Sequence, residues 1–279
     1  MKKILVALDG LKLSKPTIQY AVSIAAKHRA HLVAVFLDDV TYHSYKIFEL
    51  VGPEGVQEEK RTRLEEGDIG MRSVAAQQFT TACDNASVDY SVHHDRNIAL
   101  QELIHESIYA DLLIISEQET LTHYTENPPT RFVRDLLESV QCPVLVVPDH
   151  FKAIKKVCLL FDGEPSSVFA VRMFGYTLAE LIDSEVEVVT VKKPGLSGHV
   201  PDNHLMKEFM KRHFATARYV VLHGDPETEI LRHLRSFGED TLLVLGAYRR
   251  GMVSRWFRPS MADLLMMEKK MPLFIAHNK

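Results

Sequence analysis

Short, almost uninterrupted apolar runs recur along the chain and alternate with segments of helical periodicity. A run that is apolar on both faces predicts a strand of a parallel sheet, because helices cover such a strand on both sides. The alternation of these runs with helices predicts an α/β fold with right-handed crossovers. The predicted strands are residues 4–8, 31–37, 88–92, 112–116, 144–147, 157–161, 186–191, 219–222, 242–245 and 273–276.

Three of the intervening helices can be described further. The first has Ser14 as N-cap and Pro16 in its first turn. The last begins after Ser260, and residues 56–83 form a helix that we expect to be interrupted near Gly67 and Gly70. Spacing of three to four residues predicts the buried stripes of the first and last helices: Ile18, Ala21, Val22, Ala25 and Ala26 in the first, and Met261, Leu264, Leu265 and Met267 in the last.

An internal repeat divides the chain into two halves. Residues 2–37 and 155–190 align at an offset of 153, so that Asp9-Gly10 matches Asp162-Gly163 and Ser14 matches Ser167. The segments 142–147 and 271–276 are similar in the same way. A period this long indicates duplicated domains rather than a solenoid. We therefore expect two domains, residues 1–150 and 151–279.

Composition narrows the class of protein. A chain of 279 residues with 46% hydrophobic and 25% charged residues is ordinary for two globular domains. The net charge of −4 gives no case for nucleic-acid binding, and no apolar run approaches the roughly 20 residues that span a bilayer. Three scattered cysteines do not make a disulfide framework or a zinc site. We expect a cytoplasmic location, with no membrane or nucleic-acid partner.

The segment after residues 242–245 carries the strongest candidate chemistry. Gly246 ends the apolar run, and Gly251 lies in a loop that leads to Ser260 at the start of the last helix. Arginine donates paired hydrogen bonds to phosphate, and a helix N-terminus favours anions. The alternative is a solvated basic loop, or salt bridges to neighbouring acids. The loop contains four arginines: Arg249, Arg250, Arg255 and Arg258.

This loop resembles the C-terminal signature of the universal stress protein family. The family's nucleotide loop has a glycine, two residues, a glycine, nine residues and then Gly-Ser or Gly-Thr. Gly246 and Ser260 keep the first and last positions without a gap, whereas Arg249 and Pro259 replace the other two glycines. The resemblance covers nearly the whole chain. It implies two tandem Rossmann-like domains of the adenine nucleotide alpha hydrolase-like type, each a mainly parallel five-stranded sheet flanked by helices.

The resemblance also implies a site for ATP or another adenine nucleotide in the second half. Asp162, at the end of a strand, would contact the adenine; the alternative is a turn aspartate followed by glycine, which is common without a ligand. The complete predicted set is Asp162, Val191, Gly246, Arg249, Gly251, Arg258, Ser260 and Met261.

The matching loop of the first half departs further from the family pattern. Residues 116–119 read Ser-Glu-Gln-Glu, and Thr130 and Arg131 align with Pro259 and Ser260. Glu117 and Glu119 would repel a triphosphate. Only the second half is therefore expected to bind a nucleotide, and Asp9 is the weaker of the two strand-end aspartates.

The sequence indicates no metal site and no catalytic constellation. Adjacent His93 and His94 on a strand point to opposite faces, so they do not share one ion. The motifs Gly-x-Ser-x-Gly, His-Glu-x-x-His and the P-loop are absent. The prediction is a non-catalytic stress-response factor. The alternatives are a protein-interaction or signalling module that has lost nucleotide binding, and a weak ATPase or self-phosphorylating protein that uses Ser260.

The last strand of each half sets the expected assembly. Residues 144–147 and 273–276 are apolar edge strands, which proteins seldom leave bare. In the family these strands pair across a dimer, and here we expect them to pair within one chain as an intramolecular pseudo-dimer. The sequence leaves further homodimerisation, and the identity of any protein partner, open.

Overall fold

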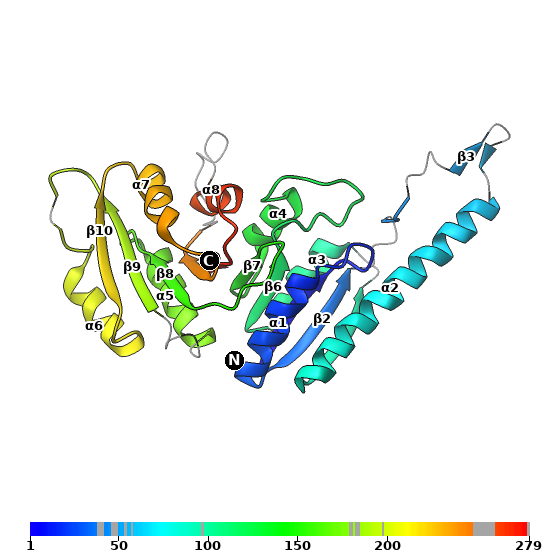
Figure 1. Cartoon of the computed structure of the whole chain (residues 1–279), viewed down its shortest axis with the longest axis horizontal. Coiled ribbons are helices and arrows are strands. Elements are labelled where there is room, and N and C mark those ends of the chain that lie inside the picture. The colour runs from blue at the N-terminus through cyan, green and yellow to red at the C-terminus, as the bar shows by residue number, and fades with distance from the viewer. Residues whose placement is uncertain are drawn as a thin grey trace.

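A single ten-stranded sheet forms the centre of the molecule in the computed structural model (Figure 1). The structure describes residues 1–37, 42–45, 50–52, 55–56, 58–95, 98–178, 181, 185–196, 198–247 and 260–277. The strand order is β10-β9-β8-β11-β12-β7-β6-β1-β2-β5. The strands are β1 (Lys3–Leu8), β2 (His31–Leu37), β5 (Tyr90–Asp95), β6 (Leu112–Ser116), β7 (Val144–Val147), β8 (Lys156–Leu160), β9 (Glu185–Lys192), β10 (Arg218–His223), β11 (Thr241–Leu245) and β12 (Leu273–Ile275).

Helices cover both faces of this sheet, as the nearly continuous apolar strands require. On one face α1 (Lys15–His28), α2 (Glu58–Ala86), α5 (Pro165–Thr177) and α6 (Asn203–His213) share one apolar cluster. On the other face α3 (Ala99–Ser107), α4 (Arg131–Ser139), α7 (Pro226–His233) and α8 (Met261–Glu268) share a second cluster, together with the 3-10 turn η3 (Leu234–Ser236). The predicted α/β fold with a mostly parallel sheet is confirmed.

The two halves have the same strand order, and they meet at one antiparallel pair. In each half the first strand lies third from the outer edge, with two strands on either side. Every pairing described within a half of this sheet is parallel, whereas β12 pairs antiparallel with β7. Phe274 lies opposite Leu145 in this pair. The predicted pairing of the last two strands within one chain is confirmed, while the domain boundaries at residues 150 and 151 stay a prediction.

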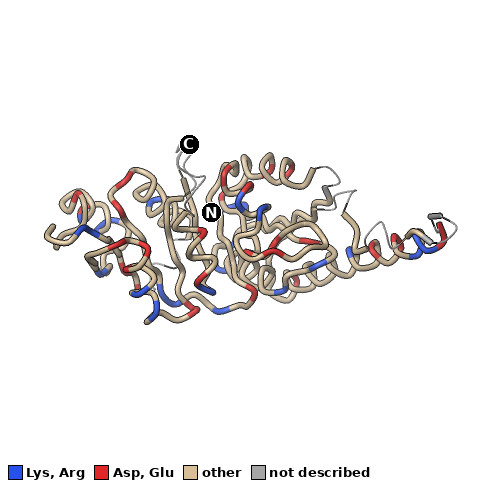
Figure 2. The backbone as a smooth tube through the Cα atoms, turned by 90° about the horizontal axis from the view of Figure 1, so that it is seen from above, with Lys and Arg blue, Asp and Glu red and all other residues tan. Residues whose placement is uncertain are grey.

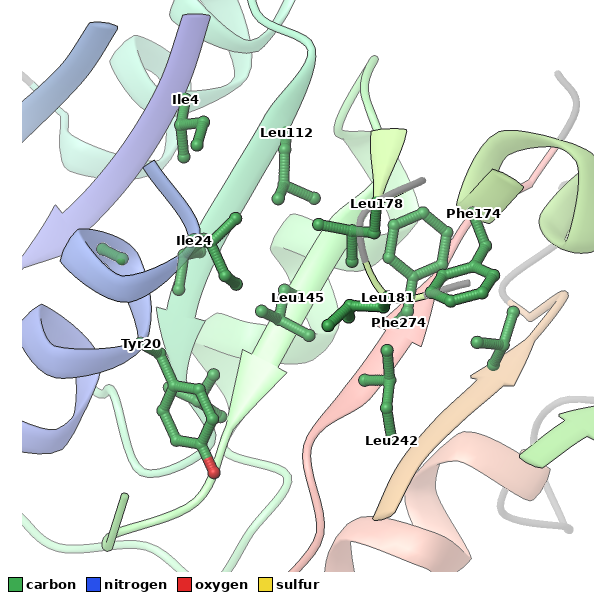
Figure 3. Packing of buried hydrophobic residues seen from close by; sticks show 14 of the residues in the cluster. Ile4, Tyr20, Ile24, Leu112, Leu145, Phe174, Leu178, Leu181, Leu242 and Phe274 are labelled. Carbon is green, nitrogen blue, oxygen red and sulfur yellow. The ribbon is translucent and has the colours of Figure 1, made fainter. Parts of the chain in front are cut away.

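The apolar core is continuous across the β7–β12 pair. Figure 3 shows Leu145 of the first half beside Leu178, Leu181 and Phe274 of the second. The Phe174 and Phe274 rings meet edge to face with 5.7 Å between their centroids. The same cluster reaches Tyr20 on α1, which is 1% exposed. The two halves are therefore held together by packing as well as by backbone hydrogen bonds.

The predicted helix starts are correct, but neither predicted apolar stripe is fully buried. The Ser14 hydroxyl accepts a hydrogen bond from the amide of Thr17, as a capping residue should. Ala26 is exposed, however, and Ile24 is buried in its place. In α8 Met267 is 52% exposed and Met266 is buried. Successive helix residues are about 100° apart, so the buried side of each helix differs clearly from the one that residue spacing alone suggested.

The expected interruption of α2 near Gly67 and Gly70 is wrong. The helix is continuous over 29 residues, with buried Ala75, Phe79 and Cys83 packed against the sheet. Packing of this second part sustains the helix, although each glycine costs about 1 kcal/mol relative to alanine. The first part of α2 runs away from the sheet and carries the short hairpin of β3 (Val51–Gly52) and β4 (Gly55–Val56) at its tip (Figure 1).

The start of α2 is a solvated, mixed-charge face. Figure 2 shows acidic and basic residues interspersed along this projecting end. Arg61 pairs with Glu58 and with Glu65 one turn away, with nitrogen–oxygen distances of 3.2 Å in both cases. Among the helices of the described residues, none is long and apolar enough to cross a membrane.

Candidate functional site

In the first half, the carboxyl ends of the parallel strands meet the loops that precede α1 and α4, and in the second half they meet the turn that precedes α5. Open parallel sheets bind ligands at this edge. In the first half the edge contains a cavity of about 460 Å³, lined among others by Lys12, Lys15, Gln118, Glu119 and Asp149. The cavity therefore lies where the sequence predicted the weaker of two equivalent sites.

Asp9, at the end of β1, is buried and fully engaged by the chain itself. It is 1% exposed, and its Oδ1 accepts hydrogen bonds from the amides of Leu11 at 2.7 Å and Lys12 at 3.1 Å. The Tyr42 hydroxyl donates to Oδ2 at 2.8 Å. Burial, and then the Asp9 charge, raises the pKa of Tyr42, so this hydroxyl stays a donor. The Tyr42 hydroxyl thus makes the hydrogen bond to Asp9 that an adenine would otherwise donate.

The loop that follows β6 binds the chain's own cation. The Lys12 ammonium donates to the backbone carbonyl of Thr122, and lies 3.3 Å from that of Tyr124. Buried Glu119 accepts hydrogen bonds from the amides of Thr120 at 3.0 Å and Leu121 at 3.1 Å. Burial, and then the Asp9 charge, raises the pKa of Glu119. This loop therefore turns carbonyl oxygens and a carboxylate towards Lys12 and Asp9, whereas a phosphate-binding loop offers backbone amides to its ligand.

The N-terminus of α4 is capped by residues of the same loop. The Thr130 hydroxyl accepts from the amide of Val133 at 3.2 Å and donates to the carbonyl of Glu119. The Glu126 carboxylate accepts a hydrogen bond from the amide of Arg131 at 2.7 Å. A helix N-terminus favours an anion, and Glu126 supplies one from within the chain.

The equivalent aspartate of the second half is open to solvent. Asp162 follows β8 and is exposed, and its Oδ1 accepts a hydrogen bond from the amide of Glu164 at 2.9 Å. Gly163 has a φ of 89°, and a Cβ atom there would lie 2.6 Å from that of Pro201. The turn therefore requires its glycine, and the Asp162 carboxylate stands at the rim of the strand ends.

Gly246 allows a close approach between the end of β11 and α5. A Cβ atom at this position would lie 2.5 Å from the carbonyl carbon and oxygen of Ser166, in the first turn of α5. No side chain fits between β11 and this helix. On the opposite face of the sheet, Val191 on β9 and Met261 on α8 are partly buried against the apolar cluster that α7 and α8 share. The predicted residues Gly246, Val191 and Met261 thus belong to the framework around the strand ends.

Ser260 caps α8 in a reciprocal arrangement with Asp263. The Ser260 hydroxyl accepts from the amide of Asp263 at 3.1 Å, and the Asp263 carboxylate accepts from the amide of Ser260, also at 3.1 Å. Arg134 on α4 of the other half lies 3.9 Å from the second Asp263 oxygen. The predicted residues Arg249, Gly251 and Arg258 lie outside the described residues.

Four residues at the strand ends were missed in the sequence: Lys12, Tyr42, Glu126 and Asp263. Asp263 stands three residues after Ser260, which is the spacing of a capping box and could have been recognised. Lys12, Tyr42 and Glu126 meet partners that are far away in the sequence or in irregular loops, so no periodic signal marks them. Within the described residues, no group of three or more His, Cys, Asp or Glu side chains is placed to hold a metal ion.

Comparison with known proteins adds a family and a fold. A sequence model of the universal stress protein family matches residues 1–148. A universal stress protein from Archaeoglobus fulgidus DSM 4304 has a TM-score of 0.70 at 12% identity, with 98% of each chain covered. A functionally unknown protein from Pseudomonas aeruginosa PAO1 has a TM-score of 0.62 at 14% identity, over 99% of this chain and 92% of that one. No curated protein matches. At these identities the likeness to the solved structures concerns the fold.

Proposed function

This chain belongs to the universal stress protein family, and on that basis we propose a non-catalytic, cytoplasmic stress-response factor whose second half receives an adenine nucleotide. The family match exceeds half of the chain. The repeat and the shared strand order support two domains, residues 1–150 and 151–279, which have diverged in the same crevice. In this proposal the first domain keeps the fold but no longer binds a nucleotide.

The observation that carries the proposal is the contrast between Asp9 and Asp162. Both follow the first strand of their half, in Asp-Gly pairs that align in the repeat. Asp9 is 1% exposed and accepts three hydrogen bonds from groups of the same chain, whereas Asp162 is exposed. A carboxylate at the carboxyl end of a parallel strand can accept hydrogen bonds from adenine or ribose only if a ligand reaches it.

A second candidate function is a protein-interaction module that has lost nucleotide binding. It is favoured by the internal carboxylates at both helix N-termini, Glu126 on the amide of Arg131 and Asp263 on that of Ser260. Each places negative charge where a phosphate would otherwise be stabilised. The engagement of the Ser260 hydroxyl in the cap also argues against self-phosphorylation there.

Calorimetric titration with ATP and AMP separates the two candidates. We expect weak binding to the wild-type protein, loss of that binding in Asp162→Ala, and unchanged binding in Asp9→Ala. Asp162 is the better probe than Gly246, because a side chain at Gly246 would displace α5 and confuse ligand loss with misfolding. Purified protein should also be denatured and its supernatant analysed by ion exchange for retained nucleotide.

The outcomes are distinct. Binding that is lost on changing Asp9 but not Asp162 would contradict the choice of half. No binding of either nucleotide, together with no retained nucleotide in freshly purified protein, would favour the interaction module.

A further inference from the structure

A cluster of charged residues lies where the two halves and the segment between them meet. Glu117 and Gln118 follow β6, and Asp149 and His150 follow β7. Lys270 precedes β12 of the second half. Glu239, also from the second half, reaches the cluster from the turn before β11. The β7–β12 ladder runs next to this cluster, so the cluster is at the junction itself.

Glu117 is the most confined member of the cluster. It is 4% exposed, and its amide donates to the carbonyl of Val147 at 2.9 Å, which continues the β6–β7 ladder. Its Oε2 atom is buried and has no hydrogen-bond partner in the described part of the chain. A buried ionised carboxylate without donors is strongly disfavoured, whereas the neutral acid is tolerated.

Both an acidic and a basic side chain lie near Glu117. Asp149 faces it from the segment between the halves, Lys270 from the second half and the Tyr20 hydroxyl from α1. Burial first, and then the Asp149 charge, raises the pKa of Glu117 to about 8, while Lys270 opposes the shift. Glu239 and Glu117 together help to raise the pKa of Tyr20, after its burial.

The same groups fix the segment that joins the halves. The Asp149 carboxylate lies 3.7 Å from the Lys270 ammonium. It also accepts hydrogen bonds from the Gln118 side-chain amide at 3.4 Å and from the His150 ring at 3.0 Å. The His150 Nε2 atom lies 3.1 Å from a Glu239 oxygen. The amide of Lys152 donates to the Tyr20 hydroxyl at 3.2 Å, and the Phe151 ring packs on the Tyr20 ring with 4.8 Å between centroids.

We propose that Glu117 is the proton-responsive element of a switch at this junction. When Glu117 is the neutral acid, Lys270 pairs with Asp149, and the joining segment stays packed on α1. As the carboxylate, it repels Asp149 and competes for Lys270, which is the cation that links Asp149 to the second half. The predicted consequence is a looser segment 148–155 at alkaline pH, without a change in either half's sheet.

The direction of the pH dependence follows from proton linkage. A carboxyl group whose pKa is higher in the native than in the unfolded state holds a proton that the unfolded chain has released. The contribution of Glu117 to stability is therefore most favourable below its ordinary value of 4.5, and it declines as the pH rises towards about 8. Above that pH the unfavourable contribution is complete and no longer changes.

Hydrogen exchange resolved by peptide tests the switch on the full chain. The backbone amides of residues 149–155 should lose protection by about tenfold or more between pH 6 and pH 9, after correction for intrinsic exchange. Glu117→Gln should abolish this loss, because the amide side chain does not ionise. Glu119→Gln is the matched control: it alters a buried acid two residues away whose contacts lie in the loop, so the pH response should persist.

Two results would overturn the proposal. One is a wild-type segment 148–155 with the same protection at both pH values, and the other is a Glu117→Gln protein that retains the pH response. If Glu117→Gln does not fold, carbon NMR of the wild-type side-chain carboxyl decides the matter. A titration midpoint near 8 supports the switch, and a midpoint near the ordinary glutamate value of 4.5 rejects it.

Discussion

A single residue type at equivalent places serves different purposes in the two halves. Asp9 and Asp162 both follow the first strand of their half and precede a glycine. The Tyr42 hydroxyl and two amides satisfy Asp9, so its charge stabilises the loop around it. Asp162 uses one oxygen to form its turn and is otherwise presented to solvent. The role of each aspartate follows from its donors and its exposure.

Tyr42→Phe tests the closure of the first crevice. Removing the hydroxyl leaves one buried Asp9 oxygen without its 2.8 Å donor. We expect the free energy of unfolding to fall by about 1–3 kcal/mol, measured by urea denaturation at neutral pH. Tyr109→Phe is the control, because that side chain is 68% exposed and should change stability by less than about 0.5 kcal/mol. Equal stability of the two variants would mean that the Tyr42–Asp9 hydrogen bond does not hold the loop.

At this scale the sequence predicted positions better than partners. It placed Asp9 and Asp162 at strand ends, because apolar runs and Asp-Gly pairs are local signals. It did not predict that Tyr42, 33 residues later in the chain, reaches Asp9, or that Lys12 reaches the carbonyl of Thr122. Such contacts depend on the path of irregular loops, for which side-chain periodicity carries no information.

At the scale of helices and strands, two glycines differ in whether neighbouring backbone leaves room for a side chain. Gly246 touches the backbone of α5 so closely that a Cβ atom would lie 2.5 Å from Ser166. Around Gly70 on α2, a Cβ atom would meet nothing within 4 Å. The sequence predicted that Gly246 contacts a ligand and that Gly70 interrupts its helix. In the structure, the first glycine allows close helix–strand packing, and the second lies within a continuous helix.

Gly70→Ala and Gly246→Ala should therefore have effects of opposite sign. Alanine at position 70 restricts the unfolded chain and suits the helix, so we expect stabilisation by about 0.5–1 kcal/mol. Alanine at position 246 forces α5 away from β11, and overpacking of this kind costs about 1–3 kcal/mol. Thermal unfolding of the two variants beside the wild type measures both. A neutral Gly246→Ala would contradict the close approach, and a destabilising Gly70→Ala would mean that another surface contacts α2 there.

The strands were predicted more accurately than the helix faces. A strand buried on both faces is apolar at every position, so β1, β6 and β11 could be recognised without deciding which side each residue faces. A helix face depends on the orientation of the helix on the sheet, and a rotation of about 100° exchanges Met267 for Met266. Packing of Phe79 and Cys83 likewise overrode the glycines of α2.

Across the whole molecule, the β7–β12 ladder should make the two halves unfold together. Leu145 lies opposite Phe274 in that ladder and is fully buried. We expect Leu145→Ala to lower the free energy of unfolding by about 2–5 kcal/mol. The loss should be seen equally in the exchange of amides of β2 and of β9, which each lie next to an edge strand of the sheet. Leu205→Ala, on a side chain that is 66% exposed, provides the control. A loss confined to β2 would show that the halves unfold independently.

The single antiparallel pair at the centre of the sheet also has an evolutionary consequence. Two identical copies joined at this edge would carry every substitution on both sides of their axis, so a change that closed one crevice would close both. A chain that contains both partners is free of that constraint. Tyr42 can cover Asp9 in one half while Asp162 stays open in the other, and the closed half can still supply the edge strand that the open half requires. Duplication within one chain thus lets each half be selected for a different task.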